Sequence, residues 1–162
     1  MIATKQLSKA FERNMRIVQM QTNGLSLADS VLQMPFRANC LNWVVGHILA
    51  NRDEILKSLG EEPLLSNEEI NIYIRDSEPV IAEVAGVILL ERMLELLSHG
   101  QERIASGLAD LDIEDYSRDV KVGNQKSTLG ERLFFLYFHE TYHVGQTEFL
   151  RQLAGKDDKV IP

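Results

Sequence analysis

Apolar residues recur every three or four positions along four long segments of this 162-residue chain, and that period constrains the fold more than any other feature. Steps of three and four keep apolar side chains on one face of an α-helix, whereas a half-buried strand needs strict alternation. Alternation over more than a few residues is almost absent from the sequence. The pattern therefore predicts an all-α fold.

Two of the predicted helices lie in the first part of the chain. The first spans about residues 4–22, and Gly24 follows it where a left-handed C-cap is expected. The second begins near Asn39, a good N-cap residue, and stops at Gly60. Residues 61–77 are polar, and we expect a connection there with at most a short helical turn.

Two more helices are predicted in the second part. The third opens at Ser77 and continues to about Leu108. The fourth begins at Thr128, where the letters T-L-G-E place Glu131 at the capping-box position, and it ends at Gly155. Between them we expect a long connection.

The domain prediction follows from length and from the helix count. Residues 109–126 form the long connection, with a turn at Gly123-Asn124, and no internal repeat is visible. A chain of 162 residues is long enough for one core. We therefore predict a single domain over residues 1–162, built as a four-helix up-and-down bundle.

The most apolar stretch covers residues 79–90 and belongs to the predicted third helix. Glu83 interrupts it and Glu91 follows it, so it falls short of a membrane span of about 20 residues. An all-round apolar helix is either buried at the centre of the monomer or covered by a second copy in a homodimer. The sequence leaves both alternatives open.

Composition limits the partners and the compartment. The formal net charge of -7 opposes a phosphate backbone, and no basic stripe offsets it, so nucleic acid is not an expected partner. Cys40 is the single cysteine and cannot form an internal disulfide. The N-terminal residues lack the apolar region of a secretory signal, so we expect a cytoplasmic protein.

Polar residues interrupt the apolar stripe in the middle of the fourth helix. His139, His143 and Gln146 continue the stripe begun by Leu129, Leu133 and Leu136. His139 and His143 are four residues apart, so their side chains lie one turn apart and can converge on one metal ion. Taken alone, such a pair also occurs on helix surfaces or paired with carboxylates.

His47 supplies a third imidazole from the middle of the second helix. By itself it would be read as a hydrogen-bonded core residue. Three histidines facing one interior give the ligand count of an open site, in which further metal positions are free for water or substrate. We therefore predict a metal site between the second and fourth helices, formed by His47, His139 and His143.

The letters H-E-x-x-H at residues 139–143 also occur in zinc proteases. A metzincin would continue with a glycine and a third histidine, but those positions hold Gln146 and Phe149. Glu148 lies on the same helix and points elsewhere. A typical zinc protease is therefore not expected.

The segments "NWVVGHILANRDEIL" and "FHETYHVGQTEFLRQL" together resemble the DinB-like (DinB/YfiT) superfamily of four-helix-bundle metalloproteins. The motifs that match are N-W-x-x-G-H and H-x-x-Y-H-x-G-Q, and the resemblance extends over essentially the whole chain. It implies that His47, His139 and His143 bind a divalent metal. Val144 departs from the family pattern, which often has a basic residue there.

The resemblance implies zinc or nickel as the commonest ions, although imidazole ligands also suit iron and manganese. It further implies a metal-dependent enzyme that activates water or a low-molecular-weight thiol, as a hydrolase or a thiol S-transferase. The alternative is a non-catalytic metal- or ligand-binding stress protein in which the metal is structural. A closed metal shell would favour the structural alternative, and a substrate-sized cavity the enzyme.

Several neighbours of the histidines are candidate site residues. Glu140 is a candidate general base, with an exposed or supporting carboxylate as the alternative. Gln146 and Asn42 are candidates to hold the ligands or orient water, with helix packing as the alternative. Trp43 and Tyr142 are candidates to line a substrate pocket, although aromatic residues at helical spacing more often belong to a core.

Overall fold

The computed structural model describes residues 3–83 and 85–161 and is mostly helical. In chain order its elements are α1 (Thr4–Thr22), α2 (Leu27–Ser30), α3 (Leu41–Ser58), α4 (Asn67–Tyr73), α5 (Leu90–Asp110), α6 (Ile113–Ser117), β1 (Asp119–Val122), β2 (Gln125–Thr128) and α7 (Leu129–Leu153). The prediction of an all-α fold is confirmed. Strand structure in the described residues is confined to one short antiparallel hairpin.

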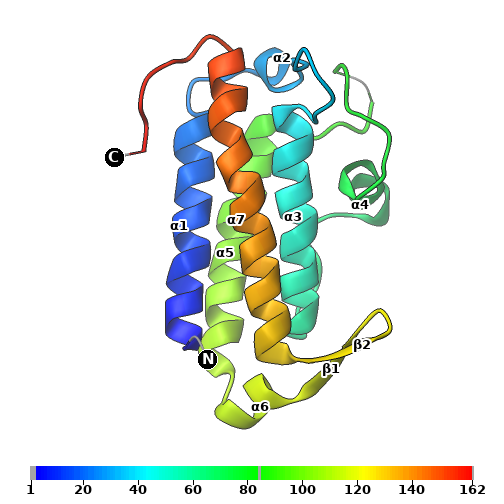
Figure 1. The fold of residues 1–162 in the computed structure, drawn as a ribbon, viewed down its shortest axis with the longest axis vertical. Coiled ribbons are helices and arrows are strands. Elements are labelled where there is room, and N and C mark those ends of the chain that lie inside the picture. The colour runs from blue at the N-terminus through cyan, green and yellow to red at the C-terminus, as the bar shows by residue number, and fades with distance from the viewer. Residues whose placement is uncertain (1–2, 84, 162) are drawn as a thin grey trace.

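The four long helices α1, α3, α5 and α7 lie side by side and enclose a common core (Figure 1). Leu7, Phe11 and Val18 form the buried stripe of α1. α3 is buried on nearly all sides, because α5, α7 and the short helix α4 all pack against it. α3 is therefore the central helix of the fold, and it carries His47.

The direction of α5 differs from the up-and-down prediction. Asn42 near the start of α3 donates to the Ile88 carbonyl just before α5, and Leu59 after the end of α3 lies against Gly107 near the end of α5. α3 and α5 therefore run parallel. α7 runs antiparallel to α3, because Asn51 reaches the Leu136 carbonyl while Glu54 reaches Arg132.

The up-and-down order is wrong because the connection between α3 and α5 crosses the length of the molecule. Short loops force neighbouring helices to be antiparallel, whereas a long crossover permits a parallel pair. An 18-residue helix such as α3 is about 27 Å long, and residues 59–89 are ample to span that distance. The crossover carries α4 against one side of α3 (Figure 1).

The predicted third helix begins later than expected, at Leu90 instead of Ser77. Its predicted first half is non-helical over residues 77–83 and 85–89, while Val84 lies outside the described residues. Contacts with other elements replace the helical hydrogen bonds: the Val80 carbonyl accepts from Cys40, and the Tyr73 hydroxyl accepts from the Ile88 amide. The described residues of the apolar stretch are therefore held by Cys40 and Tyr73 without forming a helix. Both alternatives for an all-round apolar helix, a central position or a homodimer interface, lose the helix that they require there.

The other predicted boundaries agree with the structure to within one or two residues. Thr128 and Glu131 form a reciprocal capping box at the start of α7, as predicted. α3 begins after Cys40 rather than Asn39. The turn at Gly123 joins β1 to β2, and it uses the left-handed conformation that glycine tolerates. No helix within the described residues is both long and apolar enough to cross a membrane.

Two glycines beside the histidines have opposite surroundings. A Cβ added to Gly46 would lie 2.2 Å from the ring of Tyr73, whereas one added to Gly145 would meet no atom within 4 Å. Tyr73 is fully buried and its hydroxyl is hydrogen-bonded to Asn42, so the ring has nowhere to move. Gly46 is therefore required for the close approach of α4 to α3.

We expect Gly46→Ala to reduce the free energy of unfolding by roughly 1–3 kcal/mol, because the added methyl overpacks a full core. Gly145→Ala should raise it by up to about 1 kcal/mol, because alanine favours the helix and fits the open space. Urea unfolding followed by circular dichroism measures both. Equal effects of the two substitutions would contradict the packing described here.

Candidate metal centre

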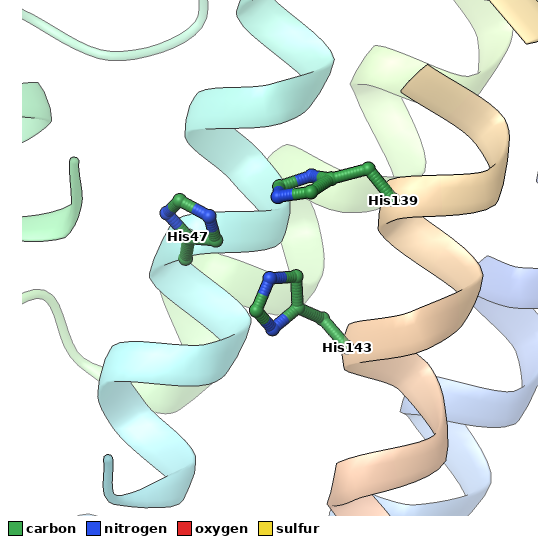
Figure 2. Close-up of side chains that lie close together, drawn as sticks. All are labelled: His47, His139 and His143. Atoms are coloured by element: carbon green, nitrogen blue, oxygen red, sulfur yellow. The ribbon is translucent and has the colours of Figure 1, made fainter. Parts of the chain in front are cut away.

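Three histidines from two helices face one another. His47 comes from the middle of α3, while His139 and His143 come from successive turns of α7 (Figure 2). One ring nitrogen of each lies within 4.8 Å of the others. Figure 2 shows the rings pointing into the space between the two helices rather than into either one. The three predicted ligands are thus brought together.

Each imidazole is also held from behind. The Nδ1 atom of His47 lies 2.6 Å from the Tyr73 carbonyl oxygen. The Nδ1 atom of His139 lies 3.1 Å from Oδ1 of Asn51, and that of His143 lies 2.8 Å from Oε1 of Gln146. These oxygens only accept hydrogen bonds, so each Nδ1 carries the proton and donates it. The three Nε2 atoms are left with free lone pairs.

This arrangement fits a divalent transition metal. Ligand histidines in metalloproteins commonly donate their second ring nitrogen to a carbonyl or carboxylate oxygen, which fixes the tautomer and the orientation of the ring. Three neutral imidazole nitrogens form a donor set that suits zinc, nickel and neighbouring ions. The geometry agrees with that requirement at all three residues.

Asn51 is a site residue that the sequence analysis missed. Its Nδ2 group donates to the Leu136 carbonyl, which leaves Oδ1 turned toward His139. Asn51 follows His47 by four residues and therefore lies one turn along the same face of α3. That spacing is the signal that would have found it.

Burial keeps the three imidazole rings in the neutral form, which can coordinate a cation. Burial lowers the pKa of His47 and His139 below the usual value for histidine. Burial also lowers the pKa of His143 to about 4. All three rings are therefore neutral near pH 7, and a metal ion does not have to displace protons from them.

Aromatic rings flank the histidines. Trp43 stacks on His47 with ring centroids 4.6 Å apart and an interplanar angle of 14°. Tyr142 meets His143 edge-on at 5.3 Å, and Phe135 stacks beside His139 at 6.3 Å. Within residues 3–83 and 85–161 the histidine cluster therefore has aromatic neighbours, and no carboxylate is grouped with it.

The cluster forms part of the wall of a large open cavity of about 1620 Å³. Trp43, Tyr142 and Gln146 line this cavity together with the three histidines. The structure therefore places these three residues beside the histidine cluster. The cavity continues along the groove between α3 and α7 and is bordered by residues 33–39 and 74–81, which include Asn39 and Ser77.

Asn42 does not belong to the site. Its side chain is fully buried, donates to the Ile88 carbonyl and accepts from the Tyr73 hydroxyl. Asn42 is one residue before Trp43, which lines the cavity, and one residue along a helix turns the side chain by about 100°. The Asn42 side chain therefore faces the crossover connection and not the histidines. The alternative role in helix packing is the correct one for Asn42.

The geometry is also against Glu140 as a general base. Both of its oxygens accept hydrogen bonds from Arg52 at 3.0 Å, and both side chains are completely buried between the helices. From Leu136 the helical period continues equally well to His139 or to Glu140, and it is Glu140 and Val144 that extend the core face. The histidines lie on the neighbouring face, toward the cavity.

We expect Glu140→Gln to lower the free energy of unfolding by about 3–5 kcal/mol, because it leaves the Arg52 guanidinium buried without its counter-charge. Glu148→Gln, on the exposed side of the same helix, is the matched control and should change stability by less than about 0.5 kcal/mol. Chemical denaturation measures both. A small effect of Glu140→Gln would mean that the pair is not a structural element.

Comparisons with known proteins give a fold relationship only. No protein-family model matches the chain, and no curated protein matches it. Among solved structures, it is similar to the crystal structure of a conserved protein from Enterococcus faecalis. The TM-score is 0.75 over 96% of this chain and 99% of that one, at 20% sequence identity. The chain therefore shares its helical fold with that protein.

Proposed function

We propose that the protein is a metal-dependent enzyme of the DinB-like class, with a divalent transition metal held by His47, His139 and His143. The observation that carries the proposal is the shared orientation of the three rings. Each Nδ1 is satisfied by an oxygen acceptor, and each Nε2 is left free on the wall of an open cavity. Three unconnected core histidines have no physical reason to adopt this arrangement.

The family assignment rests on the resemblance of two sequence segments and on the fold. The N-W-x-x-G-H segment lies on α3 and the H-x-x-Y-H-x-G-Q segment on α7, so both motifs contribute to one cluster. The four long helices support a bundle of the kind that the resemblance implies. Similarity to the Enterococcus faecalis protein supports the helical fold and nothing further.

An enzyme is favoured over a structural metal protein because the cluster is open on one side. A structural zinc site is usually closed by four protein ligands. Here three histidines are grouped, and among the described residues no carboxylate or thiol joins them. The adjoining cavity is large enough for a small-molecule substrate.

A bound divalent ion would supply Lewis-acid chemistry, lowering the pKa of a water or thiol that reaches it. The protein would hold the three imidazoles neutral and oriented, and Trp43 and Tyr142 would restrict access of bulk water. With Glu140 engaged by Arg52, no carboxylate within the described cluster serves as a base. A bound ion would let either a thiol or a water ionise near neutral pH without a protein base, so both substrates fit the site, and thiol transfer is the first reaction to test. Hydrolysis is the second reaction to test.

We expect the purified protein to bind about one equivalent of zinc or nickel, and His47→Ala or His143→Ala to abolish tight binding. Gln146→Leu should weaken affinity by roughly 10–100-fold, because it removes the acceptor that orients His143. Elemental analysis and competitive titration against a chromogenic chelator provide the stoichiometry and the affinity.

The matched control for metal binding is His99→Ala, which removes the fourth histidine of the chain on the separate helix α5. It should leave the metal content unchanged. Full metal binding by His47→Ala would exclude the three-histidine site, and so would a protein that takes up no ion after reconstitution.

We also expect the metal-loaded protein to accelerate the reaction of a low-molecular-weight thiol with chlorodinitrobenzene. Bacillithiol and cysteine are suitable thiols, and absorbance of the thioether product measures the rate. His143→Ala should reduce the rate to that of the uncatalysed reaction, whereas His99→Ala should retain it. A metal-loaded protein without thiol-dependent turnover, tested also on ester substrates, would favour the structural-metal alternative.

A further inference from the structure

The side chains that line the cavity carry more positive than negative charges. Three arginines and two carboxylates line it, although the whole chain carries a net charge of -7. Arg132 pairs with Glu54, and Arg75 lies 3.6 Å from Asp76. Within the described residues Arg37 takes part in no ion pair. Arg37 therefore contributes an uncompensated positive charge to the cavity of an acidic protein.

The wall near the histidines is aromatic. The ring of Trp43 lies 4.6 Å from that of His47 and 6.4 Å from that of His143. Tyr142 meets His143 edge-on and is 62% exposed, so its ring is available to a ligand. Planar apolar groups stack favourably on such rings. An aromatic molecule would thus find contact surface directly beside the histidines.

The border of the cavity is tied together by hydrogen bonds. Gln33 donates to the Val80 carbonyl, which links the segment carrying Arg37 to the crossover connection. The indole N–H of Trp43 donates to the hydroxyl of Ser77. A pocket whose walls are already fixed loses less conformational entropy when a ligand binds. The segment that carries Arg37 is therefore linked to the crossover connection before a ligand binds.

We propose that the cavity selects an anionic small molecule with an aromatic body, whose charged group contacts Arg37 and whose ring lies against Trp43 and Tyr142. The inference rests on the proposed function, because it names the class of substrate that would be presented to the three histidines. The arginine at the opposite end of the groove, Arg132, is already neutralised by Glu54. The anionic group is therefore assigned to Arg37.

The test compares two probes of the same shape, naphthalenesulfonate and the neutral methyl naphthyl sulfone. Trp43 is the only tryptophan of the chain and lines the cavity, so its indole N–H resonance reports binding directly. Titrations are made on metal-free and on zinc-supplemented protein. We expect the anion to bind roughly tenfold more tightly than the sulfone in both samples, as for a hydrogen bond to a charged group.

Two pairs of variants separate charge from stacking. Arg37→Gln should abolish the preference for the anion, whereas Arg13→Gln, on the exposed side of α1, should retain it. Tyr142→Ala should lower the binding affinity for both probes by a similar factor. Phe138→Ala is its matched control, because Phe138 is equally exposed on α7 but does not line the cavity. It should leave both affinities unchanged.

Equal binding of the two probes by the wild-type protein would overturn the inference, and so would a preference that survives in Arg37→Gln. Failure to bind either probe would overturn it as well. Metal loading is measured on the same samples. Metal binding without an anion preference would reject this inference alone, whereas an anion preference in a protein that binds no metal would reject only the proposed function.

Discussion

The buried ion pair between Arg52 and Glu140 fixes how α3 and α7 lie against each other. Arg52 also donates to the Leu97 and Phe11 carbonyls, so its guanidinium joins all four long helices at one level. A charge without water must be fully partnered, and any sliding of one helix would break several bonds at once. The pair therefore fixes the register of the four long helices relative to one another.

The site depends directly on that register. Asn51 precedes Arg52 and holds His139, which precedes Glu140, so two neighbouring residues of α3 contact two neighbouring residues of α7. One pair faces the core and the other faces the cavity. The contact between Arg52 and Glu140 in the core holds the two helices rigidly together. The contact between Asn51 and His139 at the cavity orients the imidazole ring. Enzymes and metal proteins gain affinity from such preorganisation, because the ligand atoms need not be rearranged on binding.

Much of this could be predicted from residue spacing, because helix ends and the histidine pair are local features. The direction of α5 could not, since it depends on Val80 and Ile88 being held by hydrogen bonds to Cys40 and Tyr73 rather than by helical bonds of their own. The role of Glu140 was missed for a related reason. A carboxylate is rarely fully buried. Only the tertiary structure shows that the partner of Glu140 is Arg52, which is 88 residues away in the sequence.

The division of the histidines between the two helices has a consequence for folding. His139 and His143 form a pair as soon as α7 is helical, whereas His47 joins them only after a segment distant in sequence has docked. Closing so long a loop is costly in entropy and slow, so we expect His47 to join the pair late in folding. An ion bound first by α7 would then hold the partly folded chain until α3 packs against it. The affinity of the metal would thus grow in two stages as the chain folds.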